Sequence, residues 1–359
     1  MYLTFIFYFV IFLLCLNKNK NRAIAMSAFV IAMYLGLRYD YMYDYQSYYN
    51  YFNEVANVQY EQTSHMEIGW YYINRFFQPI GYFGFVFVTS CIFAAGLYLV
   101  WKDLAIFEYL LFAILAFVTT SSFSVISSAQ RQMLVTGIFF IAWHFLIQRK
   151  ITSLKSLFSG RSLLFYLTIF LCSFIHSSSL FLLIVPFIYL IPPKSTIVSI
   201  IMAILFLGEL IAGDLFFPTV LPYIVDQYGD YDHLLSINRD YDTVSWIGTI
   251  SYVIQATISI LVYRLCNLSK EQKVCVILYF ISILLFMSIN YAFQIFRLGL
   301  YINLSVYISI GIILYSIKDK KIRLGVSVFY LLWCIQNALF IFNVQPGTVE
   351  EYKTIFSVM

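Results

Sequence analysis

Long apolar runs recur from one end of this chain to the other, and they constrain its fold more than any other feature. Of the 359 residues, 62% are hydrophobic and 11% are charged. Each run is about as long as a helix needs to be to cross the ~30 Å hydrocarbon core of a bilayer. The alternation of apolar and polar residues that marks membrane β-strands is absent from these runs. Since helices and closed barrels alone satisfy their backbone groups in lipid, the sequence predicts an all-α, polytopic membrane helical bundle.

The runs predict about twelve transmembrane helices within a single integral membrane domain over residues 1–359. The first run has no basic segment before it and no small-residue cleavage site, so we expect a retained helix and not a signal peptide. The expected spans are residues 2–16, 23–37, 82–101, 104–120, 129–147, 162–177, 179–192, 196–213, 245–263, 274–290, 298–317 and 324–341.

The Lys and Arg residues between these runs predict the orientation of the chain. Sixteen of the 22 fall in one set of loops, and this set is expected to be cytoplasmic because cytoplasmic loops carry the excess of positive charge. Both termini are then expected outside the cytoplasm. The outer set consists of Arg38, Arg75, Arg131, Arg239, Arg297 and Lys353. The outer side also holds the two long loops, near residues 38–81 and 214–244, and most of the acidic residues. We therefore expect the working face to be extracytoplasmic.

The two outer loops combine acidic residues with tyrosines. The first opens with GLRYDYMYDYQSYYNY at residues 36–51, and the second contains DQYGDYDHLLSINRDYD at residues 226–242. Tyrosine rings can stack on the C–H faces of sugars, and carboxylates accept hydrogen bonds from sugar hydroxyls. This composition favours a saccharide site over an interfacial belt of aromatic residues, which remains the alternative. The candidate residues in these loops are Arg38, Asp44, Tyr45, Tyr48 and Arg239.

The end of the first outer loop predicts an amphipathic helix. Residues 66–77, MEIGWYYINRFF, place apolar and aromatic positions at helical spacing, with Glu67 at the start. A simple interfacial helix is one interpretation. Alternatively, Glu67 points back at Arg38 and belongs to the site.

Further polar residues are expected at the outer ends of helices. Arg131 follows a serine-rich stretch, and an arginine at membrane depth needs an acidic partner or an anionic ligand, of which we favour the ligand. Arg297 begins a later helix, and with Arg38 and Arg131 it could hold a pyrophosphate. His176 precedes three serines, and its ordinary pKa near 6.5 suits proton transfer. His144, near the cytoplasmic end of its helix, is expected to be structural.

Several common chemistries lack support in the sequence. Neither G-x-x-x-x-G-K-[ST] nor G-x-G-x-x-G is present, so no nucleotide fold is expected, and no nucleic-acid partner either. The six cysteines lie in or beside apolar runs and contain no C-x-x-C, which indicates small core residues. We expect no metal site and no cofactor.

These residues, in this order, resemble the EpsG-like branch of the bacterial Wzy-type polysaccharide polymerases over roughly residues 30–300. The shared pattern is an arginine and an Asp-Tyr with a further tyrosine, a Glu-Gly-aromatic stretch, an outer arginine, a His-Ser-Ser turn and a late arginine. In this chain the matching residues are Arg38, Asp44, Tyr45, Tyr48, Glu67, Gly69, Trp70, Arg131, His176, Ser177, Ser178 and Arg297.

The resemblance implies a GT-C-like, metal-independent glycosyltransferase of the bacterial cytoplasmic (inner) membrane. Such enzymes transfer a growing glycan from polyprenyl diphosphate, such as undecaprenyl diphosphate, onto a polyprenyl-diphosphate-linked repeat unit at the extracytoplasmic face. The product would be a capsule, O-antigen or exopolysaccharide. Besides the lipid-linked oligosaccharide and the lipid bilayer, a chain-length regulator is implied as a candidate partner.

For this reaction we predict that Arg131 and Arg297, helped by Arg38, neutralise the diphosphate. His176 is the expected general base, and Asp44 is the second candidate or else holds acceptor hydroxyls. The predicted catalytic residues are therefore His176, Arg131 and Asp44. The predicted substrate-binding residues are Arg38, Arg297, Tyr45, Tyr48, Glu67 and Arg239.

Three other functions remain open at this point. A flippase or exporter of lipid-linked saccharide would place charges along a cavity through the membrane, whereas here they gather on one face. A polysaccharide O-acyltransferase would also use a membrane histidine, but one reachable from the cytoplasmic acyl donor. A ligase that moves finished polymer onto another acceptor would share much of the expected site.

Overall fold

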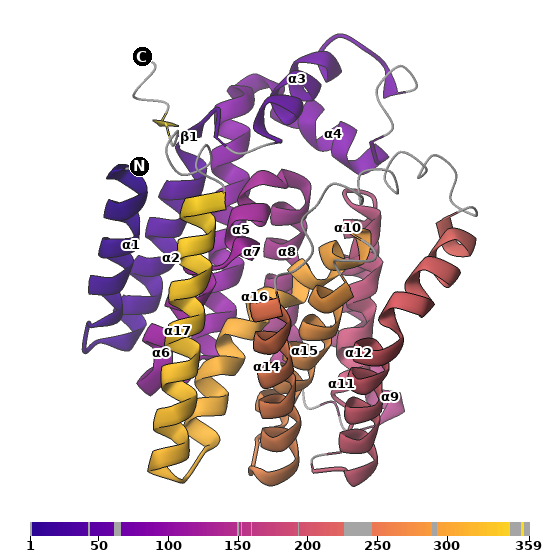
Figure 1. The fold of residues 1–359 in the computed structure, drawn as a ribbon. Helices are drawn as coiled ribbons and strands as arrows, with labels where there is room; N and C mark the ends of the chain where they lie inside the picture. The colour runs from indigo at the N-terminus through magenta and orange to yellow at the C-terminus, as the bar shows by residue number, and fades with distance from the viewer. Residues whose placement is uncertain are drawn as a thin grey trace. The chain divides into compact units, whose positions relative to one another are not determined.

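Helices make up most of the computed structural model of the chain, which confirms the predicted helical class (Figure 1). The strands within the described residues are β1 (Arg38–Tyr39) and β2 (Lys353–Thr354), which pair antiparallel with Arg38 opposite Thr354. The structure describes residues 2–41, 44–60, 66–148, 151, 153–158, 160–192, 194–225, 246–288, 293–344 and 353–354.

The chain divides into two compact units. Unit 1 contains Met1–Leu190 and Leu324–Met359, and unit 2 contains Ile191–Arg323. This division describes packing within the chain, and the single integral membrane domain expected from the sequence stays a prediction.

Unit 1 is built from helices of very different lengths, and two of them, α3 and α4, lie across one end of its bundle next to β1 (Figure 1). Its helices are α1 (Tyr2–Cys15), α2 (Lys20–Gly36), α3 (Tyr45–Val55), α4 (Ile68–Phe77), α5 (Gly81–Leu104), α6 (Leu110–Thr119), α7 (Ser121–Ser128), α8 (Gln130–Ile147), α9 (Leu154–Leu157), α10 (Arg161–Ser173), α11 (Val185–Ile188) and most of α17 (Lys320–Val344). Its short 3₁₀ segments are η2 (Gln78–Ile80), η3 (Phe107–Tyr109) and η4 (Ser177–Ile184).

Unit 2 contains four long helices among its described residues. They are α12 (Thr196–Val225), α14 (Trp246–Leu265), α15 (Lys270–Met287) and α16 (Phe293–Ser316). Here α12 corrects one expected boundary: the span predicted to end at residue 213 continues as helix through two prolines, Pro218 and Pro222, to Val225. Residues 214–225 of the predicted second outer loop are therefore helical, and the remainder of that loop lies outside the described residues.

Three helical stretches of the described chain are long and apolar enough to cross a membrane by length and composition. They are Ile68–Leu104, Gly248–Leu265 and Lys320–Leu339. Shorter apolar helices are Ile6–Cys15, Leu110–Thr119, Ser162–Ser173, Ser177–Ile188, Thr196–Ile211 and Tyr307–Ser316. The apolar runs thus become helices of a membrane protein, while the figure of twelve crossings stays a prediction.

Two glycines let α5 and α8 approach each other closely. A Cβ added at Gly96 of α5 would lie 2.3 Å from the carbonyl oxygen of Gly137 on α8, and one at Gly137 would lie 2.6 Å from Cα of Phe93. Small residues at such a crossing bring helix backbones into contact, as is usual between membrane helices. The crossing fixes the start of α8, which carries Arg131, relative to α5. Since α4 precedes α5 directly in the chain, it also limits where α4 can lie relative to Arg131.

The first outer loop contains two helices. In α3 the buried residues Tyr45, Tyr48, Phe52 and Val55 recur every three or four positions, the spacing of one helical face. The helix predicted at residues 66–77 is confirmed as α4, which buries Trp70 and Tyr71 on one face and exposes Tyr72 and Phe76 on the other.

Candidate functional site

Polar groups of unit 1 converge on the carboxylate of Glu67. This residue is the N-cap of α4, with extended backbone (φ −63°, ψ 143°), but its side chain forms no capping bond with its own helix. The two carboxylate oxygens instead contact Arg131 and the His176–Ser177 turn. Glu67, Arg131 and His176 each keep about a fifth of the side chain exposed (21%, 19% and 16%), so the cluster is half-buried.

Arg131, in the first turn of α8, contacts one of the two carboxylate oxygens of Glu67. One terminal nitrogen of its guanidinium donates to Oε2 of Glu67, and Tyr48 of α3 forms a second side-chain hydrogen bond with it. The Nε–H of Arg131 is buried and has no hydrogen-bond partner among the described residues. Because a guanidinium has five N–H donors, Arg131 can hold Glu67 and still bind a further anion.

The turn at His176–Ser177, where η4 begins, contacts the other carboxylate oxygen of Glu67. Oε1 of Glu67 accepts from the backbone N–H of Ser177 at 2.9 Å and from its hydroxyl at 3.3 Å. Nδ1 of His176 lies 3.3 Å from the same oxygen. One carboxylate thus joins segments that are 64 and 109 residues away from it in the chain.

Gly69 permits this arrangement by bringing α4 against the same turn. Its N–H donates to the carbonyl oxygen of Phe174 at 2.7 Å. A Cβ at Gly69 would lie 2.5 Å from that oxygen and 2.7 Å from the carbonyl carbon, so no other residue fits without movement of the backbone. The first turn of α4 and the turn at His176 are therefore held as one piece.

The charge state of the cluster follows from these contacts. Burial by itself raises the pKa of Glu67, but the hydrogen bond with His176, the Arg131 charge and the Ser177 N–H together lower it to about 2. Glu67 is therefore an anion at neutral pH. A carboxylate beside Nδ1 favours the tautomer with its proton on that nitrogen, which makes Nε2 the basic nitrogen of His176.

Most tyrosines of α3 are packed inside the protein. Tyr45 and Tyr48 are 4% and 8% exposed; the Tyr45 ring meets Tyr82 edge-on at 5.3 Å, and the Tyr48 ring meets Trp70 edge-on at 5.7 Å. Tyr49 is the α3 tyrosine that keeps an open ring, with 36% of its surface exposed. The predicted stacking of sugars on Tyr45 and Tyr48 stays a prediction, and Tyr49 is more exposed than either.

Arg38 lies deep in the same region, with 2% of its surface exposed. Burial raises the pKa of Tyr45, and the nearby Arg38 cation opposes that rise, which places the two side chains close together. A contact between Glu67 and Arg38 was one of two alternatives that the sequence left open. In the structure the carboxylate contacts Arg131 and His176 instead, because α4 is docked on the turn at Phe174.

Asp44 starts α3 beside the same helix junction. Its backbone N–H donates to the hydroxyl oxygen of Ser128 at 3.1 Å, and Ser128 ends α7 just before Arg131. The Asp44 side chain is half-buried and forms no capping bond within α3. Asp44 therefore lies near the start of α8.

Two predicted residues are not placed in this cluster. Arg239 lies outside the described residues, and the side chain of Arg297, in the first turns of α16 in unit 2, is not described. The proposed grouping of three arginines thus stays a prediction. Among the described residues, no group of three or more His, Cys, Asp or Glu could hold a metal ion.

Gln130 supports the site without having been singled out in the sequence. It is 1% exposed, and its Oε1 accepts a hydrogen bond from the hydroxyl of Tyr82 at 3.0 Å, which ties the start of α8 to α5. Gln130 could have been recognised in the sequence because it belongs to the polar triplet Gln-Arg-Gln at the start of an apolar helix.

At the opposite end of α8, Nδ1 of His144 lies 2.5 Å from a carboxylate oxygen of Asp103. A side-chain nitrogen of Gln148 lies 3.1 Å from the other ring nitrogen of His144. The contact with Asp103 links α8 to the end of α5, in agreement with the structural role expected for this histidine.

Comparison with known proteins adds the family. The model of the EpsG family matches residues 21–354, which includes every member of the Glu67 cluster. Neither the curated proteins nor the solved structures contain a match to this chain. The family and the apolar helices together indicate a membrane protein of polysaccharide biosynthesis. With almost its whole length matched by this family model, the chain belongs to the EpsG family.

Proposed function

We propose that this protein is a polysaccharide polymerase that transfers a growing glycan from polyprenyl diphosphate onto a polyprenyl-diphosphate-linked repeat unit at the extracytoplasmic face. The observation that carries this proposal is the contact of Glu67 with both Arg131 and His176. It joins a cation suited to a diphosphate with an imidazole suited to a hydroxyl proton. Membership of the EpsG family supports a lipid-linked saccharide as the substrate class.

His176 is the general base in this mechanism. The bond between the donor sugar and its diphosphate breaks, the acceptor oxygen bonds to the same anomeric carbon, and Nε2 of His176 takes the proton of the acceptor hydroxyl. Glu67 acts as a positioning residue: it holds Nδ1–H and stabilises the imidazolium that forms, as carboxylates do in other acid–base sites. General-base catalysis of this kind is typically worth about 10²–10⁴-fold in rate.

Arg131 receives the negative charge of the leaving group. The Nε–H of Arg131 has no partner among the described residues, and in a half-buried site a charge-assisted hydrogen bond to phosphate is stronger than in bulk water. Arg38, which is buried near Tyr45, supports this charge through its electric field, and Arg297 stays a predicted substrate-binding residue. In this mechanism Asp44 and Tyr49 hold the acceptor saccharide, with Asp44 as the second candidate base.

The proposal extends to the architecture. A GT-C-like bundle of about twelve membrane helices, with the Glu67 cluster at its extracytoplasmic end, would let the polyprenyl chain remain in lipid while its diphosphate reaches Arg131. The site needs only protein side chains for charge neutralisation and proton transfer, so we propose that the reaction is independent of metal ions.

The test is polymerisation by the purified protein in detergent. It receives polyprenyl-diphosphate-linked repeat units with EDTA present and without any nucleotide sugar. The wild-type protein is expected to give a ladder of oligosaccharides, and Arg131→Ala and His176→Ala are each expected to slow its formation by about 10²-fold or more.

Two matched variants control for general damage. Arg75→Ala removes another arginine of the same outer loop, one that binds the backbone carbonyls of Val55 and Val58. Glu54→Gln neutralises an exposed acid of α3. Both should retain most of the activity. A ladder of wild-type rate from Arg131→Ala would refute the mechanism, and saccharide translocation in proteoliposomes without any ladder would favour a flippase.

A further inference from the structure

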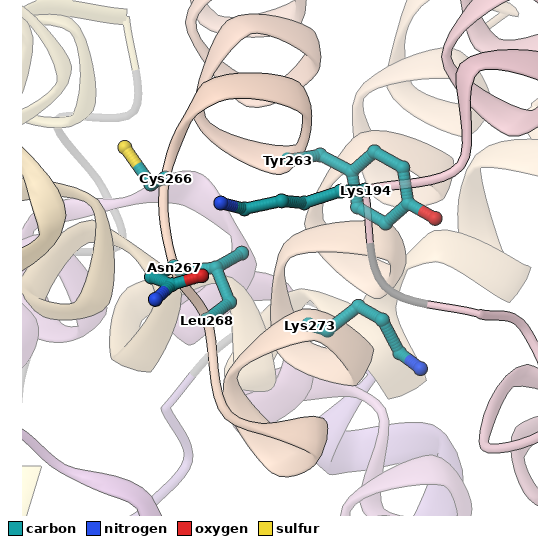
Figure 2. A pocket seen from close by; sticks show the side chains of 6 residues that line it. All are labelled: Lys194, Tyr263, Cys266, Asn267, Leu268 and Lys273. Carbon is teal, nitrogen blue, oxygen red and sulfur yellow. The ribbon is translucent and has the colours of Figure 1, made fainter.

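Unit 2 contains a cavity of about 130 Å³ with two lysines in its wall (Figure 2). It lies where α14 ends, α15 begins and the chain approaches α12. Figure 2 shows the Lys194 side chain reaching across the space between the end of α14 and the start of α15. The lining residues are Lys194, Tyr263, Cys266, Asn267, Leu268 and Lys273.

The segment that carries Lys194 is fixed by hydrogen bonds to its backbone. The Tyr263 hydroxyl donates to the carbonyl oxygen of Pro192 at 2.7 Å, and Arg264 donates to the carbonyl oxygen of Lys194 at 3.0 Å. Lys194 itself has φ +54°, a left-handed conformation that costs free energy for a residue with a side chain. The fold thus holds Lys194 in an unfavourable backbone conformation that directs its long side chain at the cavity.

Lys273 is the second cation, and it is almost completely buried. Only 2% of its surface is exposed, and its ammonium donates to the carbonyl oxygen of Ile191. An ammonium has three donors, and no carboxylate among the described residues lies within ion-pair distance of this one. Glu271 acts on this cation electrostatically without forming an ion pair, and the neighbouring Lys270 adds positive charge. A buried ammonium without an ion-pair partner is costly, so the site favours an anion.

Other charges around the cavity are also mainly positive. Burial raises the pKa of the Cys266 thiol, and the nearby cations of Lys194 and Lys318 oppose that rise, which places both beside it. The acids in this region are already engaged: Glu271 accepts from the hydroxyl of Ser269 at 3.0 Å, and Asp319 accepts from the first backbone N–H groups of α17.

We propose that this cavity binds the phosphate group of an anionic membrane lipid. Lysine ammonium groups bind phosphate as point charges, and Leu268 and Tyr263 offer apolar surface beside them. The cavity lies at the ends of apolar helices, in the loops whose lysines the sequence assigns to the cytoplasmic face, where basic pockets between helices bind lipid headgroups. This site is separate from the polymerase site and does not depend on the proposed reaction.

Cys266 provides a direct measurement of occupancy. The protein is purified in a Cys91→Ser background, which removes the other cysteine that is not fully buried. Alkylation of Cys266 by a maleimide is then followed by mass spectrometry while phosphatidylglycerol, phosphatidylcholine or inorganic phosphate is added. Phosphatidylglycerol is expected to slow alkylation by the factor 1 + [L]/Kd, roughly tenfold at ten times Kd, and phosphatidylcholine is not.

For each variant, the rate of Cys266 alkylation with lipid is compared with the rate of the same variant without lipid. This is necessary because the loss of a nearby lysine also changes the reactivity of the thiol. Lys194→Ala, at an exposed position where the change should not affect folding, is expected to raise Kd for phosphatidylglycerol by about tenfold or more. Lys321→Ala, an exposed lysine outside the cavity, should leave Kd unchanged. Lys273→Met tests the buried cation and should also weaken protection.

Each contrary result is decisive. Equal protection by inorganic phosphate at the same phosphate concentration would show a site for soluble anions and overturn the lipid assignment. Protection that survives Lys194→Ala, or equal protection by phosphatidylcholine, would overturn the role of charge. A lack of protection by all three ligands would overturn the site itself, whatever the outcome of the polymerisation assay.

Discussion

At the residue scale, one carboxylate determines the electrostatics of the candidate site. Glu67 binds the Arg131 cation, the His176 ring and the Ser177 N–H at once. The arrangement keeps Glu67 ionised, fixes the tautomer of His176 and leaves donors on Arg131. In the proposed mechanism Glu67 is therefore a positioning residue that acts through its two neighbours.

The pKa of Glu67 predicts a pH dependence of stability. It is about 2 in the folded protein, below its ordinary value of 4.5, so the unfolded chain binds more protons between these values. The stabilisation from Glu67 is therefore complete above pH 4.5 and is lost as the pH falls toward 2. We expect the Tm of the wild-type protein in detergent to fall more steeply over this range than that of Glu67→Gln.

The control for this comparison is Glu54→Gln, which neutralises an exposed acid on α3 and should keep the wild-type profile. Parallel profiles for the wild-type protein and Glu67→Gln would show that the cluster does not hold the carboxylate in its ionised form.

At the scale of elements, the site depends on how closely helices approach each other. The first turn of α4 lies against the turn at Phe174 through Gly69, and α5 crosses α8 through Gly96 and Gly137. Both contacts involve backbone atoms, which cannot rotate away as a side chain can. The relative positions of Glu67, Arg131 and His176 are thus set by backbone contacts outside the polar cluster.

Gly69→Ala tests the first of these contacts. The new methyl group would lie 2.5 Å from the Phe174 carbonyl oxygen, so α4 must move away from the turn and weaken the contact between Glu67 and His176. We expect a loss of about 1–3 kcal/mol in the free energy of unfolding, together with a large loss of polymer in the purified assay.

The matched substitution is Gly325→Ala in α17, where an added Cβ meets nothing within 4 Å. It should leave polymer formation unchanged and raise stability by up to about 1 kcal/mol, because alanine is the better helix former. Wild-type stability and polymer output in Gly69→Ala would contradict the role assigned to the close approach.

At the scale of the whole molecule, the polar residues of unit 1 separate into two groups. Residues assigned to the outer face come together, since Arg131 and His176 share Glu67 and β1 pairs with β2. At the other end of α8, His144 pairs with Asp103 in a region assigned to the cytoplasmic face. The ends of unit 1 thus carry different chemistry, and which end faces the cytoplasm is the remaining prediction.

Labelling of single cysteines tests that orientation. In a background without native cysteines, Glu54→Cys on α3 should react with a membrane-impermeant maleimide in intact cells. Ser153→Cys, also exposed but in a loop assigned to the cytoplasm, should react only after permeabilisation. The opposite pattern would place the Glu67 cluster in the cytoplasm and exclude an extracytoplasmic polymerase.

The sequence by itself determined the helical membrane class and much of the chemistry. Apolar runs of membrane length have to become helices in lipid, so the helices were predictable from composition and spacing. The helix at residues 66–77 was predictable for a similar reason, and Arg131 and His176 were recognisable because polar groups at membrane depth need a partner. The end of α12 was misplaced, since its apolar run passes through prolines that do not stop it.

The tertiary structure alone decided which partner each group has. The sequence left open whether Glu67 faces Arg38 and whether Arg131 pairs with an acid, and helix packing brought Arg131 and His176 to the same carboxylate. It also buried Tyr45 and Tyr48, left Tyr49 open and placed Lys194 and Lys273 around one cavity. Spacing along a chain specifies which face of a helix is apolar, but contacts between residues a hundred positions apart depend on how closely backbones can approach, and that is known only once the helices have packed.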